Sequence, residues 1–165
     1  MLVGVLSDTH LKEGRQLPPW LRGLLRGVDM ILHAGDVLDM SVIDELSDIA
    51  PTCAVRGNMD RGDTAASLPE KRVVEAGGFR IGLTHGYGAP WGMARKVLAE
   101  FSDEEVDCVV FGHTHRPLVE MSGGVLLFNP GTALDLRFSS RRTMGMLEIS
   151  GTVTPKIIDL EAEAR

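Results

Sequence analysis

The sequence contains few of the features that mark a membrane or secreted protein. Only two of its 165 residues are cysteine, and both lie in apolar segments, so we expect reduced core residues rather than a disulfide framework. No apolar run approaches the roughly 20 residues of a membrane span. The apolar start, Met1 to Leu6, carries no charged segment and is typical of a strand rather than a signal peptide. These absences favour a cytoplasmic protein with no membrane partner.

The chain also has no excess of basic residues. It carries 17 Lys and Arg against 23 Asp and Glu, a net charge of -6, which argues against nucleic acid as the main partner and against an added nucleic-acid-binding domain. Hydrophobic residues make up 44% and charged residues 24%, a balance typical of globular proteins. A chain of this length suits one domain, which we expect to span residues 1–165.

The first third of the chain alternates between predicted strands and helices. Such alternation indicates a mainly parallel sheet with right-handed crossovers, in which ligands bind beyond the carboxyl ends of the strands. Ser41 is the expected cap of the second helix, with acidic residues in its first turn, and Pro51 ends it. The predicted strands are 2–6, 29–34 and 52–55, and the first helix is 20–26.

The remaining chain is expected to be richer in antiparallel strands. Glycine pairs at 77–78 and 123–124 predict two hairpins, and a helix is expected to open at Pro90 and Trp91. The antiparallel C-terminal third suggests a second sheet packed on the first. The predicted strands are 71–76, 79–84, 108–111, 117–121, 125–128, 142–149 and 152–160; residues 61–70 are expected to be an irregular loop, and 161–165 a frayed tail.

Two histidines follow the buried strand 108–111. His113 and His115 are two residues apart, so an extended backbone would direct both toward one site. Two imidazoles that converge on one point usually indicate a metal, although two surface loop histidines would give the same pattern.

The same pattern recurs at four other strand ends, where a metal-ligand type follows an apolar strand, usually beside glycine. Four of the five histidines belong to this set; His33 lies inside a strand end and is expected to be buried, supporting a ligand rather than acting as one. For Asp8 alone, a turn or cap would be an ordinary explanation. The five places are Asp8/His10, Asp36, Asn58, His85 and His113/His115.

The ordered set Asp-x-His, Gly-Asp, Gly-Asn-x-Asp, His-Gly and Gly-His-x-His resembles the calcineurin-like metallophosphoesterase superfamily, and the length resembles its small single-domain phosphodiesterase branch. The motifs span residues 8 to 115. The resemblance implies an α/β fold in which two mixed β-sheets pack as a sandwich with helices on the outer faces. It also implies two divalent transition-metal ions per chain, with manganese favoured and iron, zinc and nickel as alternatives.

Carried over by position, the resemblance assigns a role to each residue of the set. Asp36 would bridge both metals and a hydroxide between them would attack phosphorus, while Asn58 would help to stabilise charge on the phosphoryl oxygens. Asn58, Asp36 and His85 are the expected catalytic residues. The first metal would take Asp8, His10 and His115, and the second would take Asn58, His85 and His113.

Met59 departs from the family pattern. Many members have histidine at this position, where it is thought to protonate the leaving oxygen, and a thioether cannot donate a proton. Asp60, which follows, is expected to orient a ligand instead. The departure leaves the proton donor open.

The expected function is a metal-dependent phosphodiesterase acting on a small phosphodiester, and a homo-oligomer remains open. The alternative is a non-catalytic protein-interaction scaffold of the same fold, which resembles the retromer sorting subunit. All seven ligand positions are intact, which favours the enzyme. A nuclease of the double-strand-break type lacks support, because the chain is acidic and shows no added DNA-binding domain.

Overall fold

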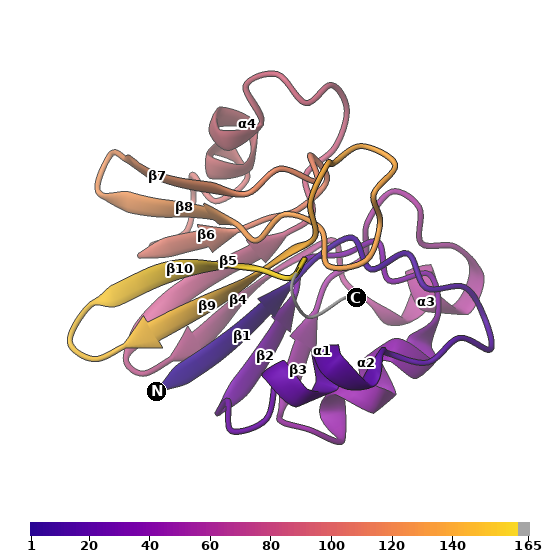
Figure 1. The fold of residues 1–165 in the computed structure, drawn as a ribbon. Helices are drawn as coiled ribbons and strands as arrows, with labels where there is room; N and C mark the ends of the chain where they lie inside the picture. The colour runs from indigo at the N-terminus through magenta and orange to yellow at the C-terminus, as the bar shows by residue number, and fades with distance from the viewer. Residues whose placement is uncertain (162–165) are drawn as a thin grey trace.

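The computed structural model describes residues 1–161 and contains two mixed five-stranded sheets (Figure 1). The first sheet has the order β10-β9-β1-β2-β3 and the second has the order β4-β5-β6-β8-β7. The strands are β1 (Leu2–Leu6), β2 (Met30–His33), β3 (Thr52–Ala54), β4 (Lys71–Ala76), β5 (Phe79–Thr84), β6 (Cys108–Val110), β7 (Leu118–Ser122), β8 (Val125–Asn129), β9 (Thr143–Ile149) and β10 (Val153–Asp159).

Each sheet has a parallel centre. In the first sheet β1, β2 and β3 are parallel, as the strand–helix alternation predicts, and in the second sheet β5, β6 and β8 are parallel. The expectation that the C-terminal third forms the second sheet is wrong in part. The hairpin β9–β10 extends the first sheet through antiparallel pairing with β1, whereas β7–β8 joins the second sheet. Hairpin signals fix local pairing but not which sheet edge a hairpin meets.

Three apolar clusters join the layers. The residues between the two sheets include Val5, Leu32, Ile81 and Phe128, all fully buried. A second cluster packs the first sheet against α1 and α2, and a third packs the second sheet against α4. The sandwich therefore has helices on its outer faces, which confirms the expected fold class. The helices are α1 (Pro19–Leu24), α2 (Met40–Ser47), α3 (Gly62–Ser67) and α4 (Met93–Ala99).

Three local expectations need correction. The segment 61–70 contains α3, a short helix without a side-chain cap, which explains why its start carries no recognisable signal. In α2 the cap is Asp39, whose side chain accepts a hydrogen bond from the Ser41 amide, and the first turn holds no acidic residue. The helix expected at Pro90 begins three residues later, at Met93. The frayed tail lies, apart from Glu161, outside the described residues.

No helix within residues 1–161 is both long enough and apolar enough to cross a membrane. Both cysteines are unpaired; Cys108 is buried in β6 and Cys53 is half-buried in β3. Burial raises the pKa of the Cys108 thiol to about 12, so it behaves as an inert core residue.

Candidate metal centre

The seven predicted ligand residues meet at one edge of the sandwich. They come from the loops that follow the carboxyl ends of β1, β2, β3, β5 and β6, where parallel strands present their ligands. Six of them form two sets of three, each around one side-chain oxygen, and the seventh, Asp36, lies between the sets. We call Asp8, His10 and His115 the first set, and Asn58, His85 and His113 the second set.

In the first set, both imidazoles face the Asp8 carboxylate. His115 Nε2 lies 3.0 Å and His10 Nε2 lies 3.7 Å from Asp8 Oδ1. The Asp8 side chain is fully buried, and its other oxygen, Oδ2, accepts hydrogen bonds from the Ser7 hydroxyl and the His113 amide. Oδ1 is thereby directed toward the two histidines.

In the second set, two imidazole nitrogens face the Asn58 side-chain oxygen. His85 Nε2 lies 3.2 Å and His113 Nδ1 lies 2.9 Å from Asn58 Oδ1. The opposite nitrogens meet backbone carbonyls, His85 Nδ1 at 2.6 Å from Ala34 O and His113 Nε2 at 2.7 Å from Gly88 O. These carbonyls fix the orientation of the two rings, so that the other nitrogen of each ring, His85 Nε2 and His113 Nδ1, is turned into the site.

Asp36 touches both sets with a single oxygen. Its Oδ2 lies 3.5 Å from His10 Nε2 and 3.4 Å from His85 Nε2. Its Oδ1 accepts a hydrogen bond from the Met59 amide. The carboxylate is therefore held between the two sets.

The spacing argument for His113 and His115 holds only in part. Both reach the same edge, but they face different sets, because the backbone between them is not extended. Their φ angles are 67° and 56°, and Asp8, His10 and Asp36 also have φ between 48° and 56°. Left-handed conformations are uncommon for residues other than glycine and cluster at functional sites, where the surrounding structure holds the strain.

Glycines let the loops pack this closely. A Cβ on Gly112 would overlap the Ser7 hydroxyl and lie 2.7 Å from Asp8 Oδ2, and a Cβ on Gly57 would overlap the Asp36 carboxylate. The glycines that precede predicted ligands are therefore required by close approach to other ligands.

The supporting residues fall where the sequence places them. His33 is fully buried and lies 3.2 Å from the Thr9 hydroxyl. Asp60 accepts hydrogen bonds from the amides of Asp36, Leu38 and Gly57, so it orders the two loops that carry Asp36 and Asn58. Neither acts as a ligand in the two sets.

Burial and neighbouring charges shift the pKa values of several side chains in the site. Burial would raise the pKa of Asp8, but the adjacent imidazoles of His10 and His115 and the charge of His85 hold it well below its usual range. Burial would lower the pKa of His85, yet its hydrogen bond with Asp36 and the charges of Asp8 and Asp36 raise it to about 9. Burial lowers the pKa of His33 to about 4. Perturbed pKa values of this kind are typical of functional sites.

The donor set fits a metal. Within residues 1–161, several buried polar atoms of the first set have no hydrogen-bond partner: Asp8 Oδ1, both ring nitrogens of His10 and His115 Nδ1. Buried polar groups are normally paired, so these atoms indicate a missing partner. Two groups have ligand atoms close enough for one ion, Asp8–His10–His115 and Asp8–Asp36–His85. Mixed imidazole and carboxylate donors suit divalent transition metals.

The structure adds three residues that the sequence does not indicate. Asp135 Oδ2 lies 3.5 Å from His10 Nε2 and 3.9 Å from His115 Nδ1. Arg137 binds Asp135, and the Phe138 ring packs edge-on against His115 with centroids 5.5 Å apart. They belong to the segment between β8 and β9, for which the sequence predicts neither a helix nor a strand.

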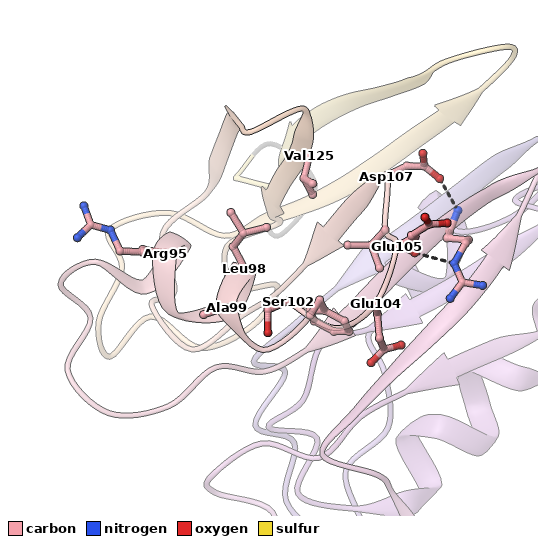
Figure 2. A pocket seen from close by; sticks show the side chains of 11 residues that line it. Arg95, Leu98, Ala99, Ser102, Glu104, Glu105, Asp107 and Val125 are labelled. Carbon is pink, nitrogen blue, oxygen red and sulfur yellow. Dashed lines mark hydrogen bonds between the residues drawn. The ribbon is translucent and has the colours of Figure 1, made fainter.

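A cavity of about 580 Å³ adjoins the second set. Asn58 and His85 form part of its wall, together with Arg56, Lys71 and Tyr87. A larger cavity of about 690 Å³ lies beside α4 and is lined by Leu98, Phe101 and Val125, among others (Figure 2). None of the seven predicted ligands lines it, so the smaller cavity is the one that matters for the site.

The fold and the site define a metallophosphoesterase-type protein, and comparison with known proteins gives the family. Residues 1–152 match the calcineurin-like phosphoesterase superfamily domain, and the chain belongs to this superfamily. A probable metallophosphoesterase of Methanocaldococcus jannaschii is 36% identical over 163 residues, which cover 98% of this chain and 82% of that protein.

Two solved structures have a similar fold. Vps29 from Entamoeba histolytica, in complex with Zn²⁺, has a TM-score of 0.74 and 27% identity, and the match covers 98% of this chain and 100% of that one. An archaeal phosphodiesterase has a TM-score of 0.76 and 24% identity, with 97% and 100% covered. At that identity the second likeness concerns the fold alone.

Proposed function

We propose that this protein is a metal-dependent phosphodiesterase that uses two divalent transition-metal ions, with manganese favoured. The observation that carries the proposal is the position of Asp36, whose Oδ2 lies within 3.5 Å of an imidazole nitrogen from each set. One carboxylate oxygen between two groups of imidazole donors is suited to two ions that share a ligand. The first set would hold one ion and the second set the other.

Ions in such a pair lower the pKa of water, which supplies a nucleophile at neutral pH, and offset charge on phosphoryl oxygens. The chain contributes the orientation. The carbonyls of Ala34 and Gly88 fix the ring orientation of His85 and His113, and Asp60 holds the loops that carry Asp36 and Asn58. The amide group of Asn58 is a hydrogen-bond donor that can bind a phosphoryl oxygen.

The leaving oxygen has no proton donor at position 59. Met59 is 37% exposed at the rim of the site, and its backbone amide is bound to Asp36 Oδ1. General acid catalysis typically contributes about 10²–10⁴-fold, so its absence favours diesters with acidic leaving groups. Aryl diesters are the expected good substrates, and alkyl diesters the poor ones.

The similarity to Vps29 supports a second candidate function, a non-catalytic interaction scaffold of the same fold. The enzyme is favoured because all seven ligand-type residues are present and converge on one site. A scaffold has no need for the strained backbone at five of these positions.

The test is a rate series on phosphodiesters of graded leaving-group pKa, with phosphomonoesters and cyclic nucleotides added, in the presence of manganese, zinc or nickel. The proposal expects metal-dependent hydrolysis, a preference for aryl diesters and a steep dependence on leaving-group pKa. Met59→His should raise the rate most for poor leaving groups. Metal-loaded protein that hydrolyses none of the panel would contradict the enzyme and favour the scaffold.

A further inference from the structure

The segment that joins β8 to β9 places an arginine at the mouth of the metal centre. Asp135 is the link, because its Oδ2 lies 3.5 Å from His10 Nε2 and accepts hydrogen bonds from Arg137. The Asp135 side chain is only 8% exposed, whereas that of Arg137 is 55% exposed. The guanidinium thus sits on the solvent side of the site, one carboxylate away from the first set.

The segment is anchored on both sides of this pair. The Thr132 hydroxyl donates to the backbone carbonyl of Asp8 and accepts from the Asp135 amide. On the other side, Phe138 packs against His115. Asp135 and Arg137 are therefore fixed relative to two residues of the first set, and their placement follows from the fold of the site.

Asp135 holds Arg137 in place through only part of its guanidinium group. Its Nε donates to both Asp135 oxygens, at 3.0 and 2.8 Å, and its Nη2 lies 2.7 Å from Oδ2. Nη1 takes no part in these contacts. A guanidinium has five N–H donors in a planar fork, so one edge can bind a carboxylate while other donors bind a second anion.

Arg137 lies beside an acidic part of the site. Three carboxylates, Asp8, Asp36 and Asp135, lie around the histidines within the described chain. Hydrogen bonding to Asp135 and the charge of Asp36 raise the pKa of Arg137, so the guanidinium is charged at all working pH values and lies within the field of the centre. An incoming phosphoryl group is an anion, and a fixed guanidinium at the mouth would attract it in addition to any ions that the two sets hold.

We propose that Arg137 is a phosphoryl-binding residue, which binds a non-bridging oxygen of the substrate or of phosphate, and that Asp135 positions it. The inference rests on the proposed function, since it names a further contact of the same site. It assigns to the β8–β9 segment a role in substrate binding that the seven ligand-type residues do not supply. The ligand class is a phosphoryl oxyanion, whichever alcohol it carries.

The test measures binding of inorganic phosphate to manganese-loaded protein by calorimetry, with metal content checked in each variant. Arg137→Gln should weaken phosphate binding by roughly 10- to 100-fold, the range that one charge-assisted hydrogen bond covers. Arg137→Lys, which keeps the charge but loses the fork, should fall between Arg137→Gln and wild type. Asp135→Asn should weaken binding less than Arg137→Gln does, because it removes the anchor and not the donor.

Arg141→Gln is the matched control. This arginine lies four residues further along the same segment, is 70% exposed and lies 3.5 Å from Asp159, away from the histidines. Its removal should leave phosphate binding unchanged. Equal effects of the two Gln variants, or no phosphate binding by the wild type, would overturn the inference.

Phosphate binding also separates this inference from the proposed function. A protein that hydrolyses diesters but binds phosphate equally well without Arg137 would contradict the role of Arg137 alone. A protein that hydrolyses no ester but binds phosphate through Arg137 would contradict the phosphodiesterase alone.

Discussion

At the scale of single residues, the unusual feature is that neighbours in sequence serve different halves of the site. His113 and His115 are separated by one residue, yet His113 Nδ1 faces Asn58 and His115 Nε2 faces Asp8. Left-handed backbone at both positions makes this divergence possible. The glycine and imidazole pattern predicted that both residues belong to the site, but spacing alone predicted that they point the same way.

Removal of each histidine should therefore affect a different ion. We expect His113→Ala to weaken the ion held by Asn58 and His85, and His115→Ala to weaken the ion held by Asp8 and His10. Each loss should be roughly tenfold or more in affinity, since even the partners that orient a ligand account for 10- to 100-fold. Crystallography at metal absorption edges on the two variants would identify the ion that is lost. If both variants lose the same ion, the division into two sets is wrong.

Asp135 and Arg137 lie at the site, but the sequence pattern does not predict their positions. Neither follows an apolar strand or sits beside glycine, so the rule that found the other site residues passes over them. Their positions depend on Thr132 reaching the backbone of Asp8, a contact between residues 124 positions apart. Contacts of this range follow from the completed fold, and local patterns do not encode them.

At the scale of elements, the sequence predicts the strands and hairpins well, because apolar runs and glycine pairs are strong local signals. The parallel centre of the first sheet and the β7–β8 hairpin are confirmed. Besides the cap of α2 and the start of α4, two larger expectations were wrong: α3 was expected to be a loop, and β9–β10 was assigned to the second sheet. A six-residue helix has too few turns to show periodicity, and sheet membership is decided by packing between distant segments.

The close approach of the loop after β6 to the loop after β1 can be tested with one methyl group. Gly112→Ala would place a Cβ against the Ser7 hydroxyl and Asp8 Oδ2, so we expect destabilisation of about 1–3 kcal/mol from overpacking and weaker metal binding. Gly23→Ala is the control, because this exposed position in α1 has open space around it and should gain about 0.5–1 kcal/mol. Denaturant unfolding of both variants measures the difference. A Gly112→Ala protein as stable as wild type would contradict the tight loop packing.

At the scale of the whole molecule, the buried charges of the site connect stability to pH. The pKa of His85 is raised to about 9, so in metal-free protein its contribution is full below about 6.5 and is lost as the pH rises through 9. The pKa of His33 is lowered to about 4, so its contribution is lost as the pH falls from about 6.5 toward 4. Metal-free protein should be most stable near pH 6.5.

Metal binding should reverse the way in which His85 makes stability depend on pH, because an ion competes with the proton on the His85 ring. We therefore expect the increase in melting temperature caused by manganese to grow between pH 6.5 and pH 8.5. Differential scanning calorimetry at each pH, once at a fixed free manganese concentration and once with chelator and no manganese, measures this increase directly. An increase that is constant or shrinks over this range would show that His85 does not bind an ion.

The central claim is that one carboxylate, Asp36, serves two ions. The most direct measurement is metal analysis by mass spectrometry on fully loaded, active protein and on Asp36→Ala, with Asp103→Ala as a control at an exposed aspartate outside the site. We predict two ions per chain in wild type and in Asp103→Ala, and loss of both ions, together with activity, in Asp36→Ala. One ion per chain in active wild type, or loss of a single ion in Asp36→Ala, would contradict the account.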